Sequence, residues 1–302
     1  MVTVGLLSFI VLGLLAMFNQ TQRAFKSGMT QTDVLESGRA TMDMLARELE
    51  QMTPSEGPDF VFGNVRRQAT NFFAEPTPGF AGFQPGINPL MQELPGSGSR
   101  RTNLVQRFFF LTKLNQDLIG IGYQVIPDDA NGCVGTLYRY SGTNARSGNV
   151  TVSANFVSAA QLAYQNSLRA LPITNMNKIA DGIVHLRARA YARNGFPILN
   201  TNSVVFSNIF ALTPRGPYTN VHNTAVYRNA FDAEQAACYF MSNALPAYLE
   251  VELGILEPQI LRRYRSIETA LAQRQYLTNH AAQVHLFRQR IPVRNLDFTA
   301  YP

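Results

Sequence analysis

The sequence predicts an α+β fold in which a long N-terminal helix packs on a β-rich globular domain with an antiparallel sheet. Residues 1–52 contain no proline and have the pattern of one continuous helix, first apolar and then amphipathic. From Arg107 onward, short runs rich in aromatic and β-branched residues alternate with Asn, Asp and Gly turns, as antiparallel strands do. A further helix is predicted near residues 257–283. To bury one face of each of these elements, the second part of the first helix must pack against the sheet.

The first third of the predicted N-terminal helix is apolar. Residues 4–18 carry no charged side chain, and the first ionisable side chain is that of Arg23. Counted from Met1, the run approaches the roughly 20 residues that span a bilayer, whereas a secretory signal needs a basic leader and a small-residue cleavage site. We therefore expect membrane insertion rather than a buried core helix. The residues assigned to this membrane segment are Val4, Leu6, Leu7, Phe9, Ile10, Val11, Leu12, Leu14, Leu15 and Phe18.

The rest of the helix carries a narrower apolar stripe with steps of three and four residues. It consists of Leu35, Gly38, Met42, Leu45, Leu49 and Met52. This spacing places the residues on one side of a helix, which we expect to pack on the globular domain. The helix is predicted to end at Thr53, because Pro54 restricts its predecessor and lacks an N–H donor.

Residues 53–106 are predicted to form a Pro/Gly-rich connection that lies on the domain. This region holds seven Pro and seven Gly and has little periodicity. Its many phenylalanines argue against a disordered linker, and a short strand is expected near residues 59–62.

The β-rich domain is expected to comprise residues 107–302. The strand candidates are Arg107–Leu114, Ile119–Ile126, Thr136–Tyr140, Ile183–Tyr191, Val204–Leu212, Ala247–Leu253 and, as an edge or end strand, Val284–Val293. A short helix is predicted over Asn229–Ser242. In the helix of residues 257–283, a buried stripe is predicted at Ile260, Leu261, Tyr264, Ile267 and Leu271.

Composition argues against nucleic-acid binding. The net charge is +6, but the 26 basic residues are scattered rather than clustered in a stripe. The two cysteines, Cys133 and Cys238, leave two alternatives open: a disulfide in an oxidising compartment, or two separate buried thiols.

No residues are assigned to catalysis, cofactor binding or metal binding. The four histidines lack metal-ligand spacing, and no nucleotide-binding or hydrolase motif is present. Residues 128–132 faintly resemble a calcium loop, but Arg139 stands where an EF-hand places its glutamate. Glu250 and Glu252 share one face of a strand and are expected to match Arg187 and Arg189, which face outward on theirs.

The N-terminal stretch MVTVGLLSFIVLGLLAMFNQTQRAF resembles the first helix of type IV pilins and type II secretion pseudopilins. In that family a prepilin peptidase cuts after a basic leader that ends in Gly, and a short apolar segment with a glutamate follows. The present sequence matches the part just after that glutamate and has no glutamate before Asp33. We therefore expect the true start codon to lie upstream of Met1.

The resemblance implies a minor, non-enzymatic subunit, similar to a J-type pseudopilin or a W-type minor pilin. Such a subunit is anchored in the inner membrane by a single helix, with its domain in the periplasm or in an extracellular filament. Its implied partners are other pilin-like subunits and, if a leader exists, the prepilin peptidase that precedes N-terminal methylation. Some pseudopilins bind calcium, so calcium stays open at the 128–132 loop. The alternatives are a signal-anchored binding or enzymatic domain on a helical stalk, and a nucleic-acid-binding protein.

Overall fold

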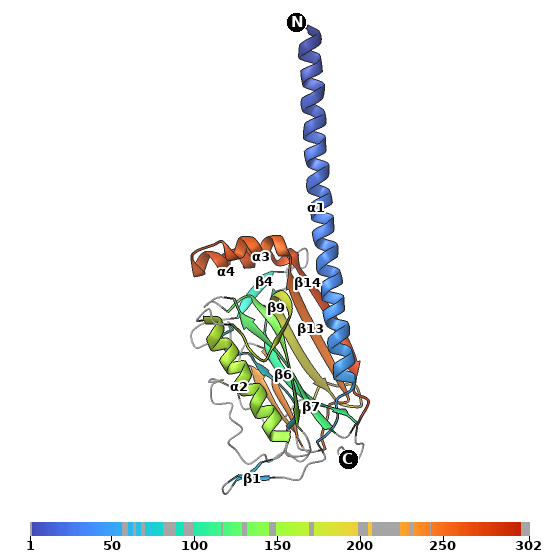
Figure 1. Cartoon of the computed structure of the whole chain (residues 1–302), viewed down its shortest axis with the longest axis vertical. Coiled ribbons are helices and arrows are strands. Elements are labelled where there is room, and N and C mark those ends of the chain that lie inside the picture. Colours follow the sequence, from blue (N-terminus) through green and yellow to red (C-terminus); the bar gives the residue numbers. More distant parts are fainter. Residues whose placement is uncertain are drawn as a thin grey trace.

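The computed structural model shows a long helix that projects from a β-rich domain (Figure 1). It describes residues 2–55, 60–62, 65–67, 70–80, 89–93, 100–115, 117–128, 132–144, 149–168, 172–198, 205–206, 224–229, 232–241 and 243–296. Helix α1 (Val2–Glu50) starts far from the domain and ends packed against it. The predicted α+β class, with a long N-terminal helix on an antiparallel sheet, is confirmed.

Ten of the described strands form one sheet, in the order β10-β11-β12-β3-β6-β7-β8-β9-β13-β14. All neighbours in it are antiparallel except the short β10 and β11. The strands are β3 (Thr70–Pro76), β6 (Gln106–Leu114), β7 (Asp117–Pro127), β8 (Gly135–Asn144), β9 (Asn177–Tyr191), β10 (Val205–Phe206), β11 (Thr224–Asn229), β12 (Asp232–Met241), β13 (Tyr248–Leu256) and β14 (Val284–Pro292). Two separate hairpins pair β1 (Phe60–Phe62) with β2 (Val65–Arg67), and β4 (Leu90–Glu93) with β5 (Arg100–Asn103).

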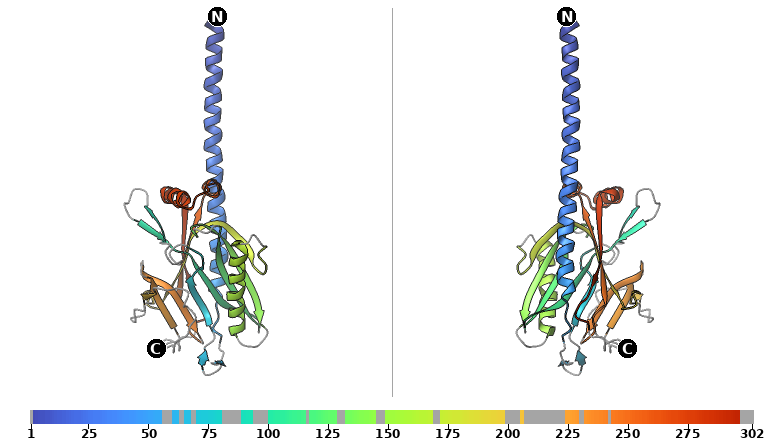
Figure 2. Two further views of the ribbon diagram at one scale, coloured as in Figure 1. Left: turned by 90° about the vertical axis from the view of Figure 1, so that its left-hand side faces the viewer. Right: turned by 90° about the vertical axis from the view of Figure 1, so that its right-hand side faces the viewer.

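The sheet lies between α1 on one face and α2 (Asn149–Leu168) on the other (Figure 2). Successive side chains of a strand point to opposite faces. Accordingly, Phe108 belongs to the same core as Leu45 and Leu49 of α1, while Phe109 stacks on Phe156 of α2 with 5.5 Å between ring centroids.

Two glycines of β7 allow α2 to approach the sheet closely. A Cβ atom at Gly120 would lie 2.1 Å from Val152, and one at Gly122 would lie 2.3 Å from Phe156. The Gly-Ile-Gly sequence of this strand therefore has a packing reason.

Helices α3 (Pro258–Arg265) and α4 (Ala270–Asn279) lie across the end of the domain from which α1 projects (Figures 1 and 2). A 3₁₀ turn (Ala281–Gln283) leads from them into β14. Leu261, Tyr264 and Leu277 form a small core there with the ends of β9 and β13. This arrangement corrects the single helix predicted over residues 257–283. The first helix stops at Ser266, and Leu271, predicted to be buried, is 81% exposed.

Two further predictions need correction. The helix predicted over Asn229–Ser242 is replaced by strand β12 and the end of β11. Cys238 and Phe240 face one core while Ala237 and Tyr239 face the other, so this strand is apolar on both faces and its period of two is hidden. The predicted connection, residues 53–106, contributes β3, which lies inside the sheet between β12 and β6. Most of the strand predicted over Val204–Leu212 lies outside the described residues.

Candidate functional site

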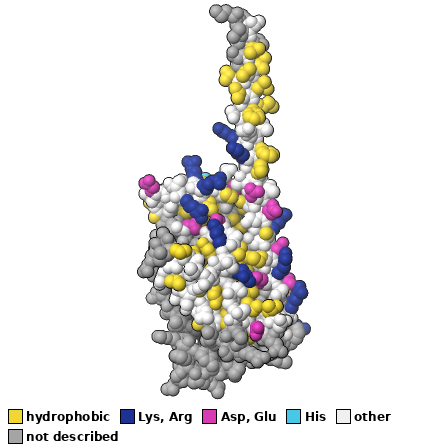
Figure 3. Space-filling model, in the orientation of Figure 1, with side chains coloured by type: hydrophobic (Ala, Val, Ile, Leu, Met, Phe, Trp, Pro, Cys, Tyr) yellow, Lys and Arg dark blue, Asp and Glu magenta, His cyan; other side chains and the backbone are white. Residues whose placement is uncertain are grey.

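The first half of α1 exposes its apolar side chains to solvent on all sides. Leu7, Phe9, Ile10, Val11, Leu12, Leu14, Leu15 and Phe18, all assigned from the sequence to a membrane segment, are between 46% and 79% exposed. The side chains of Val4 and Leu6 lie outside the described ones. Because the exposed residues include neighbours in sequence, they surround the helix rather than forming one stripe. This bare apolar helix is the most unusual surface of the chain (Figure 3).

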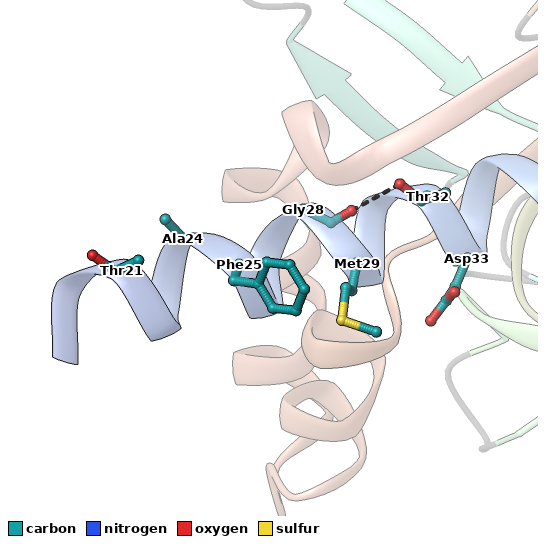
Figure 4. Close-up of a pocket in the computed structure, with 7 residues that line it drawn as sticks. All are labelled: Thr21, Ala24, Phe25, Gly28, Met29, Thr32 and Asp33. Atoms are coloured by element: carbon teal, nitrogen blue, oxygen red, sulfur yellow. Dashed lines mark hydrogen bonds between the residues drawn. The ribbon is translucent and has the colours of Figure 1, made fainter. Parts of the chain in front are cut away.

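A shallow groove continues this surface toward the domain. It is lined by Thr21, Ala24, Phe25, Gly28, Met29, Thr32 and Asp33 (Figure 4). The Thr32 hydroxyl donates to the Gly28 carbonyl oxygen over 3.0 Å, so it is satisfied within the helix. Apart from the adjacent residues and the nearby helix backbone, no described atom lies within 4 Å of a Cβ built on Gly28. The groove is therefore open to another apolar element along α1.

The second half of α1 packs on the sheet. Of the stripe assigned from the sequence, Met42, Leu45, Leu49 and Met52 lie in the main core. Leu35 is only half-buried, and its neighbour Val34 is buried instead. This difference is a correction to the predicted stripe: the helix is rotated so that Val34 rather than Leu35 faces the sheet.

One close approach and one polar cluster fix the position of the packed half. A Cβ atom at Gly38 would lie 2.2 Å from the Phe287 ring on β14, so only glycine fits without a shift of that ring. Glu48 of α1 accepts hydrogen bonds from the Tyr123 hydroxyl and from Arg139, whose Nη2 is 2.8 Å from Oε1.

The electrostatics of this cluster follow from burial and from Glu48. Burial disfavours the charged Arg139, but the hydrogen bond and charge of Glu48 outweigh burial and raise the pKa of Arg139. Burial, together with the hydrogen bond to Glu48, raises the pKa of the Tyr123 hydroxyl above its ordinary value, so this group remains a donor. This cluster was not predicted from the sequence. The signal for it was a glutamate one residue before Leu49, at the margin of the apolar stripe.

The other polar site lies on the sheet, where β9, β13 and β14 carry rows of opposite charges. Glu250 is directly opposite Arg189 and Arg290, and Glu252 is directly opposite Arg187 and Arg288. Ion pairs form both directly across the strands and diagonally. Arg189 is 3.5 Å from Glu250 and Arg288 is 3.4 Å from Glu252, each directly opposite, while Arg288 also reaches Glu250 diagonally at 2.7 Å. The predicted match between the two glutamates and the arginines of β9 is confirmed. Arg187, however, is buried and not on an outer face.

His185 lies at one end of this charged region, and its side chain is neutral and fully buried. Its Nδ1 accepts a hydrogen bond from the Leu104 backbone N–H over 3.1 Å, which leaves Nε2–H to donate to Glu252 over 3.3 Å. Burial lowers the pKa of His185. Burial alone would raise the pKa of Glu252, but the His185 hydrogen bond and the nearby arginines lower it to about 2. Glu250 and Glu252 are both paired with arginines, so removing either carboxylate would leave positive charge without its partner in the sheet.

The described residues contain no group of three or more His, Cys, Asp or Glu side chains that could hold a metal ion. Of the residues considered for calcium, 129–131 lie outside the described part. Asp128 binds Arg265 at 2.6 Å and accepts from the Thr136 hydroxyl. Burial raises the pKa of Asp128 despite these partners. The Arg265 guanidinium is thus already paired with the Asp128 carboxylate that a bound cation would need.

The cysteines form no disulfide. Cys133 and Cys238 are both buried, and neither is bonded to another cysteine. They lie in different cores, Cys133 beside α3 and α4 and Cys238 on β12 in the main core. The disulfide alternative is therefore wrong, and the alternative of two buried thiols is confirmed. Burial also raises the pKa of Cys238 to about 12, so it remains a neutral core residue.

Comparison with protein-family models, with curated proteins and with solved structures finds no match. Within the described residues, no helix combines the length and the hydropathy that crossing a membrane demands.

Proposed function

We propose that the chain is a non-enzymatic, pilin-like subunit, anchored by the first half of α1 and assembled through it with other subunits of a filament. The observation that carries this proposal is the contrast along α1, in which an apolar half exposed all round continues into a half fixed to the sheet. An apolar side chain left in water forgoes about 1.5–3 kcal/mol of burial energy. Eight such residues on a bare helix call for an apolar environment.

The exposure on all sides favours two environments, one before assembly and one after it. A single flat interface would cover one side of the helix only, whereas lipid or a bundle of similar helices covers every side. Before assembly, the segment would lie in the inner membrane. In a filament, the same side chains would pack against neighbouring helices, and Gly5 and Gly13 would allow close approach. This two-stage use supports a pilin-like role, as does the sequence resemblance of the same stretch.

The rival function is a binding or enzymatic domain on a membrane-anchored stalk. A stalk needs no fixed attachment to its own domain. Here, Val34, Gly38, Leu45 and Leu49 pack into the domain core, and Glu48 is held by two side chains of the sheet. A rigid junction of this kind favours a subunit that must hold its domain at a defined angle in an assembly.

A photo-crosslinking amino acid at Leu12 of the full chain, expressed in its native cells, tests the proposal. We expect adducts with peptides from the apolar N-terminal helices of other subunits. The same amino acid at Lys113, which is exposed at the opposite end of the domain, should give none of these helix adducts.

A charge in the apolar run separates anchoring from assembly. The variant L12K should release the chain from membranes and abolish the adducts, while Q22K, outside the run, should change neither. If the parent chain with the crosslinker at Leu12 stayed in the membrane and formed adducts with lipid alone, this result would contradict the filament proposal and favour the stalk.

A further inference from the structure

Basic side chains gather where α1 leaves the domain (Figure 3). Arg23 and Lys26 lie on α1, and Arg262 and Arg263 lie on α3; all four are exposed. We call these four residues the basic collar. The collar joins residues far apart in sequence, so it results from folding and was not predicted from the scattered basic residues.

The orientation of α3 directs its arginines toward the free half of α1. Leu261 and Tyr264 are buried in the small core beneath the helix. At 100° per residue, Gln259, Arg262 and Arg263 lie on the opposite, outer side. Gln259 confirms the direction, because its Nε2 donates to the Thr30 hydroxyl of α1 over 3.2 Å. The outer side of α3 therefore faces the same way as the projecting helix.

The collar differs from the other arginine groups in its lack of counter-charges. The arginines of β9 and β14 face Glu250 and Glu252, and Arg265 binds Asp128. For the four collar residues, the described part of the chain supplies no carboxylate within ion-pair distance. Four such charges on one end of a domain create a positive field that extends about 10 Å at 0.1 M salt.

The spacing along α1 places Arg23 at the height of the lipid headgroups and the rest of the collar farther out. With a rise of about 1.5 Å per residue, Arg23 lies roughly 8 Å, Lys26 roughly 12 Å and Thr30 roughly 18 Å beyond Phe18, the last residue of the apolar run. The interfacial layer on each side of a bilayer is roughly 5–8 Å thick. Arg23 would therefore lie among the headgroups, and the arginines on the outer side of α3 would lie within about one screening length of them.

We propose that the basic collar binds the headgroups of anionic phospholipids and so holds the α3 end of the domain against the membrane surface. The inference rests on the proposed function, because it requires the apolar half of α1 to lie in a bilayer. Basic residues near an anionic surface each strengthen association about fivefold. The collar would thereby fix the height and tilt of the domain before assembly.

The test uses the full chain in vesicles of phosphatidylcholine, with or without about 30% phosphatidylglycerol, a content chosen to give a clearly anionic surface. A fluorophore on T269C, an exposed position between α3 and α4 whose side chain makes no capping hydrogen bond, reports contact with a headgroup quencher. A second label, on L12C, reports insertion of α1 through an acyl-chain quencher. The native cysteines are buried and should not react in the folded protein.

We expect quenching at position 269 only in the phosphatidylglycerol vesicles, and its loss in about 0.5 M salt, where screening is strong. The variant R262Q/R263Q should reduce the docked population at least tenfold, since two basic residues are removed. The matched control R47Q/K113Q removes two exposed charges near the opposite end of the domain and should leave quenching unchanged.

The two labels separate the possible failures. Equal quenching at position 269 in both lipids, or in R262Q/R263Q, with α1 inserted, would overturn the collar proposal and leave the proposed function intact. Absence of insertion at position 12 would overturn both.

Discussion

The two halves of α1 belong to one uninterrupted helix but differ in what covers them. The apolar side chains described between residues 7 and 18 stay exposed on all sides, whereas residues 34–52 bury a stripe in the domain. Helix propensity does not distinguish the halves, because both are rich in good helix formers. What differs is the source of burial energy: the sheet supplies it for the second half, and the surroundings must supply it for the first.

This difference means that one sequence element serves two separate purposes. The second half decides whether the domain is stable and at which angle it is held. The first half should be almost irrelevant to domain stability but decisive for location and assembly. Substitutions at matched positions in the two halves therefore test the comparison directly.

The largest effect is expected from removing core volume in the packed half. Leu49 is fully buried, so L49A should lower the free energy of unfolding by about 2–5 kcal/mol. Leu12 is 65% exposed, and L12A should change the unfolding free energy by less than about 0.5 kcal/mol. Urea denaturation of the full chain in mild detergent measures both. Equal losses would show that the free half belongs to the same cooperative unit as the domain.

Acid should destabilise the sheet without involving the free half. The pKa of Glu252 is about 2 in the folded protein and 4.5 when unperturbed, so its contribution is complete above about pH 4.5 and is lost as the pH falls toward 2. The contribution is of the order of 2–3 kcal/mol. The variant E252Q should flatten the dependence of unfolding free energy on pH over this window. The exposed E93Q should leave that dependence as steep as in the parent chain.

A glycine packed on the sheet and a glycine in the open groove of α1 should respond to alanine in opposite directions. G38A places a Cβ against the ring of Phe287 and should cost about 1–3 kcal/mol of unfolding free energy, depending on how far the half-buried ring can move. G28A meets nothing and should stabilise the helix by up to about 1 kcal/mol. Thermal unfolding followed by circular dichroism compares the two variants. A shift in the same direction for both would contradict the assignment of Gly38 as a packing position.

The sequence predicted the fold where a single period dominated. The step of three and four over residues 35–52 is clear because that half of the helix buries one side. The alternation in β9 and β13 is clear because apolar side chains occupy one face of each strand and charged or polar ones the other, although both faces are buried. The prediction failed at β12, which is buried on both faces, and at β3, whose phenylalanines are surrounded by proline and glycine. In both places tertiary burial overrides the local signal.

The candidate site was predictable only in part. An apolar run with no charge is visible in any sequence, so residues 4–18 could be distinguished from the rest of the helix, while their membrane assignment stays a prediction. Three-dimensional coincidences were not predictable. The Glu48 cluster unites α1 with β7 and β8, and the basic collar unites α1 with α3. Sequence spacing carries no information about contacts between residues more than 70 positions apart.

The smallest of these effects concerns the Glu48 cluster and decides how the packed half is held. E48Q keeps the shape of the side chain but removes its negative charge and leaves a single acceptor oxygen for Arg139 and Tyr123, which should cost about 1 kcal/mol of unfolding free energy. Glu36 is exposed on the same helix, and E36Q should have no measurable effect. Denaturant midpoints of the two variants make the comparison. If E48Q matched E36Q, the apolar stripe alone would attach α1, and Glu48 would serve only to set the rotation of the helix on the sheet.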